Sequence, residues 1–167
     1  MARNITPKPL KKSSFAPFGD VIETGPGEVR NINEGHTSRF HDLAELDLTE
    51  GGGRPSVNIF RSTPIPLPIT IRMMERHPKS SQAFYPLGDE PYLVVVAPRG
   101  ELDPAKIEVF AAGSHQGVNY HRGTWHHYSL ATGDVSDFLV IDRIADDENC
   151  DEQTLDEGDQ IIITEIS

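Results

Sequence analysis

Hydrophobic residues along the chain fall in short runs that alternate with polar ones and are separated by prolines and glycines. Alternation with a period of two is typical of strands with one buried face, and the apolar run from Tyr92 to Ala97 is typical of a strand buried on both faces. About eight to eleven such segments follow at short spacing, which predicts a mainly β fold, an antiparallel sandwich or barrel with few short helices. The clearest predicted strands are residues 56–61, 69–77, 92–97, 107–111, 138–142 and 161–163.

The predicted strand over residues 69–77 carries the first chemical signal. Ile69, Ile71 and Met73 alternate with other residues, and the same parity continues to Glu75 and His77. Since successive side chains of a strand point to opposite faces, we expect Glu75 and His77 on the face that the three apolar residues bury. A carboxylate and an imidazole would then point inward together.

A second polar stretch runs from Gly117 to Tyr128 and holds three of the seven histidines of the chain. Buried imidazole or guanidinium groups need partners, so this composition favours the wall of a site over a core, the alternative being a half-exposed β-surface. By strand parity His126 faces away from Trp125 and His127, which we expect on the outer face or at a dimer contact. The candidate site residues of this stretch are Asn119, Tyr120, His121, Arg122 and His126.

Length and charge limit the classes of function. The 167 residues suit a single domain over residues 1–167, and the formal net charge is −11. Residues 134–167 hold twelve acidic side chains and one base, Arg143, so this segment alone sums to −11. An acidic end of this kind repels phosphates, and we therefore expect neither nucleic acid nor an anionic membrane as a partner.

The cellular compartment is predicted from cysteine use and from the N-terminal residues. A single cysteine, Cys150, excludes an intramolecular disulfide framework and fits a reducing compartment. The first ten residues lack the apolar core of a signal peptide, and no window approaches the length of a membrane span. We expect a cytoplasmic protein.

The spacing of several polar residues resembles the two motifs of the cupins. Glu75-x-His77 with Gln82 matches the first motif, with Glu75 in the place of its first histidine, and Gly123-x-x-His126 matches the second. Mixed imidazole and oxygen ligands suit a hard or borderline divalent metal, for which Glu75, His77, Gln82 and His126 are the candidate ligands. A metal-free site is the open alternative, because Glu75 and the amide of Gln82 depart from the usual ligand set.

A longer match covers nearly the whole chain and resembles the ureidoglycolate lyase family. The segments that carry it are Ile32-Asn33-x-Gly35, Arg39-Phe40-His41-Asp42-Leu43-Ala44, Glu75-Arg76-His77-Pro78, Gln82-Ala83-Phe84, Gly117-Val118-Asn119-Tyr120-His121-Arg122-x-x-Trp125-His126-His127, Asp137-Phe138-Leu139 and Ile141-Asp142-Arg143. The resemblance implies a cupin-like double-stranded β-helix, or jelly-roll barrel, that forms a homodimer. It also implies cleavage of (S)-ureidoglycolate to glyoxylate and urea in allantoin catabolism, and an association with nickel.

The residues offer the groups that this reaction needs. Loss of urea requires a base for the hydroxyl proton, an acid for the departing nitrogen and a cation for the carboxylate. The candidate base is His126, or Glu75 with its pKa raised by burial, and His77 is the candidate acid. A guanidinium binds a carboxylate bidentately, and Arg61 is the first candidate, with Arg122 as the replacement if the face that Arg61 shares with Val57 and Ile59 proves outward.

The remaining candidates complete the predicted site. His121 is a further candidate for proton transfer, and Gln82, Asn119, Tyr120 and Arg122 are candidate substrate contacts. Two other functions stay open at this point. One is a metal-dependent cupin oxygenase or isomerase acting on a small oxyacid, and the other is a non-catalytic cupin that binds a small carboxylate.

Overall fold

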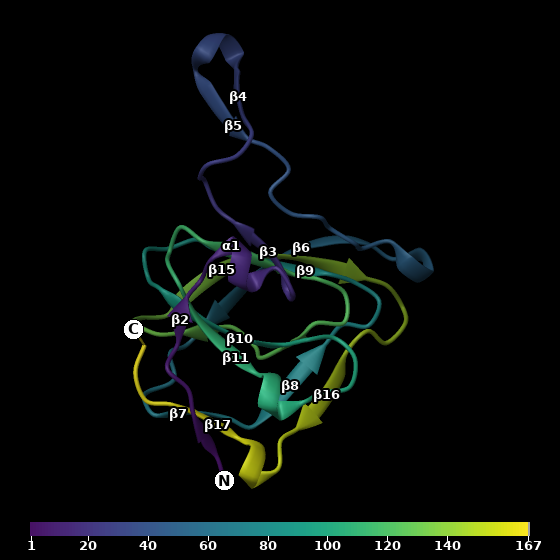
Figure 1. Ribbon diagram of the computed structural model, residues 1–167. Coiled ribbons are helices and arrows are strands. Elements are labelled where there is room, and N and C mark those ends of the chain that lie inside the picture. The colour runs from purple at the N-terminus through teal and green to yellow at the C-terminus, as the bar shows by residue number, and fades with distance from the viewer. Residues whose placement is uncertain (167) are drawn as a thin grey trace.

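The computed structural model describes residues 1–166 as three β layers and a projecting hairpin (Figure 1); Ser167 lies outside the described residues. The upper layer is a five-stranded sheet that ends in a long edge strand, β6. Nine residues of β6 pair in antiparallel register with β15, from Arg54↔Ile144 to Ser62↔Ser136. In order, its strands are β3 (Gly19–Ile22), β12 (Gly117–Tyr120), β9 (Gln82–Pro86), β15 (Ser136–Ile144) and β6 (Arg54–Ser62).

The middle layer is a seven-stranded sheet built around β10, the apolar strand whose six residues are all buried. In order, its strands are β16 (Asp151–Thr154), β8 (Met73–Arg76), β13 (Trp125–His126), β10 (Tyr92–Ala97), β11 (Glu108–Ala112) and β2 (Lys8–Pro9), with β14 (Leu130–Ala131) also paired to β10. The lower layer is the small sheet of β1 (Arg3–Asn4), β17 (Ile161–Ile163) and β7 (Ile69–Ile71).

The remaining elements are short. The hairpin of β4 (Val29–Ile32) and β5 (Thr37–Phe40) projects away from the layers at the top of Figure 1. One α-helix, α1 (Lys12–Phe15), and four 3₁₀ turns, η1 (Asn33–Gly35), η2 (Glu50–Gly52), η3 (Pro104–Lys106) and η4 (Glu157–Asp159), connect strands within the described residues. Across that same range, no helix is long and apolar enough to cross a membrane.

Two hydrophobic cores separate the three layers. The first lies between the five-stranded and seven-stranded sheets and includes Phe84, Val94 and Phe138. The second lies between the seven-stranded sheet and the small one and includes Ile71, Val95 and Ile161. Because β10 gives alternate residues to each core, both its faces are buried, as its unbroken apolar run predicts. The mainly β, cupin-like jelly roll with few short helices is confirmed.

The predicted strand over residues 69–77 proves to be two strands that belong to different sheets, β7 and β8. The chain leaves strand geometry at Arg72, and the alternation is out of phase beyond it. Met74, which is fully buried, joins Ile69 and Ile71 in the second core. The prediction that Glu75 and His77 lie on the face buried by Ile69, Ile71 and Met73 is therefore wrong. Glu75 lies on the other face of the sheet from Met74, toward the first core.

Candidate active site

Three titratable side chains meet at one end of the space between the two larger sheets. Glu75 on β8 pairs in register with His126 on β13, and His77 lies just beyond the end of β8. One ligand atom from each of the three lies within 4.8 Å of the others. The side chain of His126 is 1% exposed and that of Glu75 is 21% exposed. The structure thus brings together Glu75, His77 and His126, which we call the interior cluster.

A chain of amide and carboxylate groups orients His77. Gln82 Nε2 donates to Asp142 Oδ2 at 3.3 Å, so Gln82 Oε1 faces His77 Nε2 at 3.0 Å. The backbone oxygen of Asn149 lies 2.7 Å from His77 Nδ1. Asn58 Nδ2 also donates to Asp142, at 3.0 Å to Oδ1. Both ring nitrogens of His77 therefore face oxygen atoms that can accept a hydrogen bond.

Burial shifts the pKa values of this cluster in opposite directions. Desolvation raises the pKa of Glu75, against the influence of nearby His77. Desolvation lowers the pKa of His126 to about 3, with repulsion from His77 as a further cause. The ring of His126 stacks on Tyr120 at 4.3 Å between centroids, and burial raises the pKa of that phenol. At neutral pH His126 is a neutral imidazole and Tyr120 a neutral phenol.

The interior cluster also fits a divalent metal. His126 Nε2 is buried and has no hydrogen-bond partner in the described structure, so this nitrogen is available as a metal ligand. Glu75, His77 and His126 each offer a ligand atom within 4.8 Å of the others, and Gln82 Oε1 lies 3.0 Å from His77 Nε2. Two imidazoles, a carboxylate and an amide oxygen form a donor set for a borderline divalent ion.

A second polar group lies on the outer face of the five-stranded sheet. Asp20 Oδ2 accepts from Asn119 Nδ2 at 2.9 Å, from the Glu45 backbone N–H at 3.0 Å, and lies 3.0 Å from His121 Nε2. These hydrogen bonds outweigh desolvation and lower the pKa of Asp20. Asp20, Asn119 and His121 form the outer cluster. Strand β12 divides the predicted residues, because Tyr120 points to the interior cluster while its neighbours Asn119 and His121 point outward.

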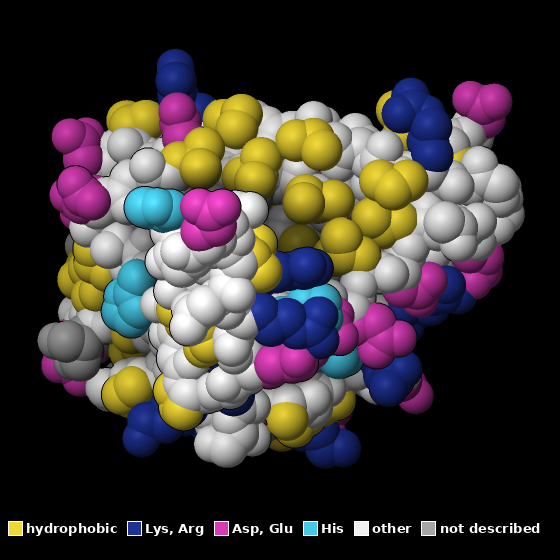
Figure 2. Space-filling view, turned by 90° about the horizontal axis from the view of Figure 1, so that it is seen from above, with side chains coloured by type: hydrophobic (Ala, Val, Ile, Leu, Met, Phe, Trp, Pro, Cys, Tyr) yellow, Lys and Arg dark blue, Asp and Glu magenta, His cyan; other side chains and the backbone are white. Residues whose placement is uncertain are grey.

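Beside the outer cluster lies a cavity of about 200 Å³, lined by Glu45, Asp47, Ser81, Arg99, His121 and Arg122. Arg122 donates to Asp47 through Nε at 2.8 Å and Nη2 at 2.7 Å, and Nη1 pairs with Glu50. Viewed from above, basic, acidic and histidine side chains meet in a recess of this face, next to a field of hydrophobic side chains (Figure 2).

Arg61 is not brought to either cluster. It pairs with Asp137 in a bidentate ion pair at 2.8 and 3.0 Å, and its side chain is 72% exposed. Asp137 precedes Asp142, the neighbour of Gln82, by five residues on β15, a separation of about 17 Å. Val57 and Ile59, which share the parity of Arg61, are 70% and 55% exposed. The face that carries Arg61 is outward in this chain, so Arg122 replaces Arg61 as the candidate partner of the substrate carboxylate.

The structure also settles the surroundings of the flanking residues. Trp125 is buried in the second core, on the face opposite His126, and its ring contacts the Arg76 guanidinium at 4.6 Å. His127 is also buried, and desolvation lowers its pKa to about 4. The prediction that Trp125 and His127 lie on the outer face or at a dimer contact is wrong, because both are buried within a single chain. The sequence analysis missed Asp142, although Asp142 shares the parity of buried Phe138 and Val140, and that signal was available. Nothing in the sequence pattern singled out Asn58, Asp20 or Asn149.

Comparison with known proteins gives a consistent result. The sequence profile of a family described as ureidoglycolate lyase matches residues 2–163. A ureidoglycolate lyase of Burkholderia mallei (strain NCTC 10229) is 54% identical over 156 residues, which cover 93% of this chain and 92% of that relative. Proteins with the same name from Azotobacter vinelandii and Pseudomonas syringae pv. tomato are 48% and 47% identical over 162 residues, covering 96% of this chain and 98% and 95% of theirs.

Proposed function

The chain belongs to the ureidoglycolate lyase family, and from this membership we propose that it cleaves (S)-ureidoglycolate to glyoxylate and urea in allantoin catabolism. The observation that carries the proposal is the interior cluster, where a carboxyl group with a raised pKa lies beside two imidazoles. The reaction breaks the bond between the carbinol carbon and the ureido nitrogen. The hydroxyl loses its proton and becomes the aldehyde oxygen, and the nitrogen takes the bonding electron pair and a proton.

Glu75 is the base that we propose for the hydroxyl proton. Its raised pKa moves the carboxylate toward the range in which a base removes protons efficiently at neutral pH. His126, the other candidate from the sequence, is a weaker base, because its pKa is lowered to about 3. Its neutral ring instead fixes one wall of the cluster.

His77 is the donor that we propose for the departing nitrogen. Both its ring nitrogens face oxygen acceptors, so an N–H on either nitrogen has a hydrogen-bond partner. Its Nε2 is directed into the cluster, toward Gln82. Proton removal by Glu75 and proton donation by His77 leave the summed charge of the two groups unchanged, so neither step requires water.

Arg122 is the proposed partner of the substrate carboxylate. It lies in the turn between β12 and β13, and the N–H of the next residue, Gly123, donates to the His77 backbone oxygen at 3.0 Å. This contact places the backbone of the turn beside His77, while the Arg122 side chain lines the cavity next to the outer cluster. Asp47 already binds Arg122 bidentately, so a substrate carboxylate would take over the hydrogen bonds that Asp47 accepts.

A divalent metal, nickel by family resemblance, is the second use that we propose for the cluster. Glu75, His77, His126 and the oxygen of Gln82 would hold it. Bound there, it would act as a Lewis acid toward the substrate hydroxyl.

Product analysis with and without a chelator tests the reaction and the metal together. Purified protein and racemic ureidoglycolate should yield urea and glyoxylate in equal amounts without ammonia. Loss of turnover on chelation, restored by nickel, would establish the metal, and unchanged turnover would assign the cluster to proton transfer alone. Release of ammonia, or no turnover with either enantiomer, would overturn the lyase proposal.

A homodimer is proposed through the outer face of β6. Val57 and Ile59 are exposed there on a long edge strand, a surface that soluble chains usually cover. Ile59→Glu should convert dimer to monomer in sedimentation velocity, whereas Leu67→Glu, of similar exposure in the loop after β6, should not. A monomeric wild-type protein would contradict the proposal. A cytoplasmic location also stays a proposal, supported by the exposed free thiol of Cys150.

A further inference from the structure

The loop between β15 and β16, residues 145–150, crosses next to the interior cluster; we call it the clamp loop. Its residue Asn149 makes three hydrogen bonds to the segment that follows β8. The backbone oxygen accepts from His77 Nδ1 at 2.7 Å, the side-chain Oδ1 accepts from the Lys79 N–H at 2.7 Å, and Nδ2 donates to Ser80 Oγ at 2.8 Å. One residue therefore binds His77 and the backbone beyond it from both its main chain and its side chain.

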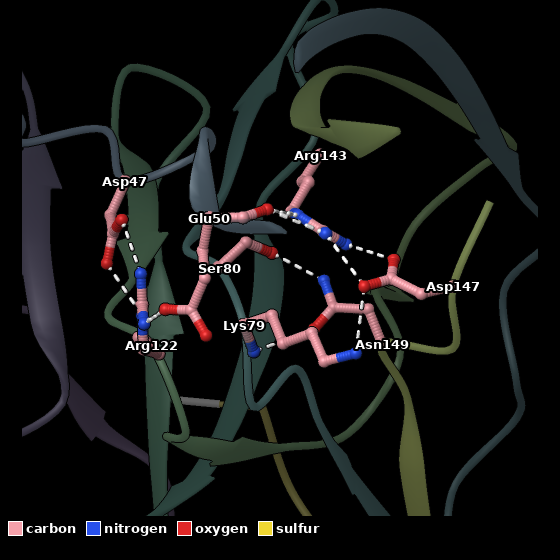
Figure 3. Close-up of polar contacts among 8 residues, drawn as sticks. All are labelled: Asp47, Glu50, Lys79, Ser80, Arg122, Arg143, Asp147 and Asn149. Carbon is pink, nitrogen blue, oxygen red and sulfur yellow. Dashed lines mark hydrogen bonds and ion pairs between the residues drawn. The ribbon is translucent and has the colours of Figure 1, made fainter. Parts of the chain in front are cut away.

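Ion pairs hold the clamp loop in place. Asp147 accepts from Arg143 Nη1 and Nη2 at 2.8 and 3.0 Å and from Lys79 Nζ at 2.8 Å. These two cations hold the pKa of the Asp147 carboxyl well below its usual range. Lys79 thus meets the clamp loop twice, through its backbone N–H and through its ammonium group. Figure 3 shows these contacts as one continuous network.

Arg143 anchors the same network to the rest of the molecule. Its side chain is 1% exposed, and its Nε and Nη2 donate to the Glu50 backbone oxygen at 2.9 and 2.7 Å. A Cβ at Gly53 would lie 2.3 Å from Arg143 Nε, so glycine is required where the η2 turn packs on the guanidinium. The side chain of Glu50 in turn pairs with Arg122. The network therefore joins the clamp loop to the proposed carboxylate partner as well as to His77.

The next residue of the clamp loop contacts the other end of the interior cluster. Cys150 Sγ lies 3.8 Å from Glu75 Oε2, with the thiol as the donor. Asn149 and Cys150 thus contact the two residues to which we assign proton transfer.

We propose that Asn149 is a positioning residue of the interior cluster. Because a carbonyl oxygen only accepts, the Asn149 backbone fixes a proton on His77 Nδ1 and directs Nε2 into the cluster. The Asn149 side chain keeps that carbonyl in place by its bonds to Lys79 and Ser80. The catalytic part of this inference rests on the proposed lyase function, and the structural part does not.

Two substitutions at Asn149 separate positioning from folding. Asn149→Ala removes both side-chain bonds, and we expect kcat to fall at least about tenfold while KM stays within about twofold, as for other groups that orient a reacting imidazole. Asn149→Asp keeps the acceptor for the Lys79 N–H and loses only the donor to Ser80, so its kcat should lie between those of wild type and Asn149→Ala. Asn31→Ala, which removes one exposed hydrogen bond to Ser38 on the β4–β5 hairpin, is the matched control and should leave kcat unchanged.

A spectroscopic measurement tests the geometry without substrate. In protein labelled with ¹⁵N-histidine, His77 should show a slowly exchanging Nδ1–H, assigned by its loss in His77→Gln, and Asn149→Ala should abolish that protection. An unchanged Nδ1–H in Asn149→Ala, or a raised KM at constant kcat, would overturn the proposal. If Asn149→Ala does not fold, Asp147→Asn, which loosens the same loop from Arg143 and Lys79, gives the same two readouts. If the wild type does not cleave ureidoglycolate, the lyase proposal fails while the Nδ1–H measurement still decides the positioning.

Discussion

The interior cluster and the outer cluster take their histidines from the same stretch, Gly117 to Tyr128, yet their surroundings differ. His126 is 1% exposed, stacks on Tyr120, and has its pKa lowered to about 3. His121 follows β12 of the five-stranded sheet, whereas His126 is on β13 of the seven-stranded sheet. The side chain of His121 is 37% exposed and lies 3.0 Å from the carboxylate of Asp20. Alternation along β12 directs Tyr120 inward and Asn119 outward, and the turn after β12 carries the chain to the other sheet, where His126 is buried.

This difference shows which cluster can change the chemistry of its groups. Desolvation raises the pKa of Glu75 in the interior cluster, whereas hydrogen bonds lower that of Asp20 in the outer cluster. A carboxylate with a raised pKa is an effective base, and one with a lowered pKa is a stable ionic anchor. We therefore assign proton transfer to the interior cluster and an anchoring role to Asp20.

The largest expected effect is that of Glu75→Gln. The amide keeps the shape of the side chain and cannot take a proton, so we expect kcat to fall by about 10² to 10⁴. The free energy of unfolding should not fall, because a partly buried carboxyl group has been replaced by a neutral one. Steady-state kinetics and urea unfolding measure the two effects.

The control for this substitution is Glu152→Gln. Glu152 pairs in register with Glu75 across β8 and β16, but its side chain is exposed. We expect kcat within about twofold of wild type. Wild-type turnover in Glu75→Gln would break the assignment of proton transfer to the interior cluster.

The second expected effect is a dependence of stability on pH that comes from the buried histidines. The pKa is lowered to about 3 for His126 and about 4 for His127, from about 6.5 in an unfolded chain. Between these values the unfolded chain binds more protons than the folded one, so stability rises with pH from about 3 to 6.5, with both histidines contributing above about 4, and levels off above 6.5. Each histidine contributes a slope of up to about 1.4 kcal/mol per pH unit.

Urea unfolding at several pH values measures this slope. The raised pKa of Glu75 acts in the opposite direction, because the folded chain holds that proton longer as the pH rises. His127→Gln should reduce the slope by the contribution of one histidine, up to about 1.4 kcal/mol per pH unit. An unchanged slope in His127→Gln would mean that the histidine is not desolvated in solution.

Sequence patterns identified the residues of the interior cluster, but they did not predict the strand arrangement that brings these residues together. Spacing grouped Glu75, His77 and His126, and the structure brings these three side chains together. The parity argument for Glu75 failed, because alternation cannot reveal that the strand breaks at Arg72 and continues in another sheet. The existence of a third β layer, which buries Ile69 and Ile71, depends on long-range pairing with β17 and has no local signal.

Arg61 and the outer cluster show a different limit of sequence patterns. Parity placed Arg61 correctly with Val57 and Ile59, but apolar residues on one face of a strand do not prove that this face is buried within one chain. Asp20 lies about a hundred residues before His121, and only the pairing of β3 with β12 joins them. The mainly β class, by contrast, follows from short alternating runs, which are local.

The third expected effect is small and tests the outer cluster. His121 points away from the interior cluster, so His121→Gln should lower kcat by less than about tenfold, through the loss of its bond to Asp20. The same kinetic assay as for Glu75→Gln measures it. A loss as large as that of Glu75→Gln would reverse the comparison and place proton transfer in the outer cavity.

The smallest expected effect is that of Arg61→Ala, which separates the two guanidinium candidates. Its ion pair with Asp137 is exposed, and pairs of this kind contribute only about 0 to 1 kcal/mol to stability. We expect kcat and KM within about twofold of wild type. Arg61 lies about 17 Å along the sheet from Asp142, the residue that binds Gln82. Arg122→Ala should instead raise KM at least about tenfold, because a carboxylate would lose a bidentate partner. The opposite result would be a raised KM in Arg61→Ala and an unchanged KM in Arg122→Ala. It would show that the substrate carboxylate binds on the outer face of β6. Because that face is exposed in a single chain, the site would then require a second subunit.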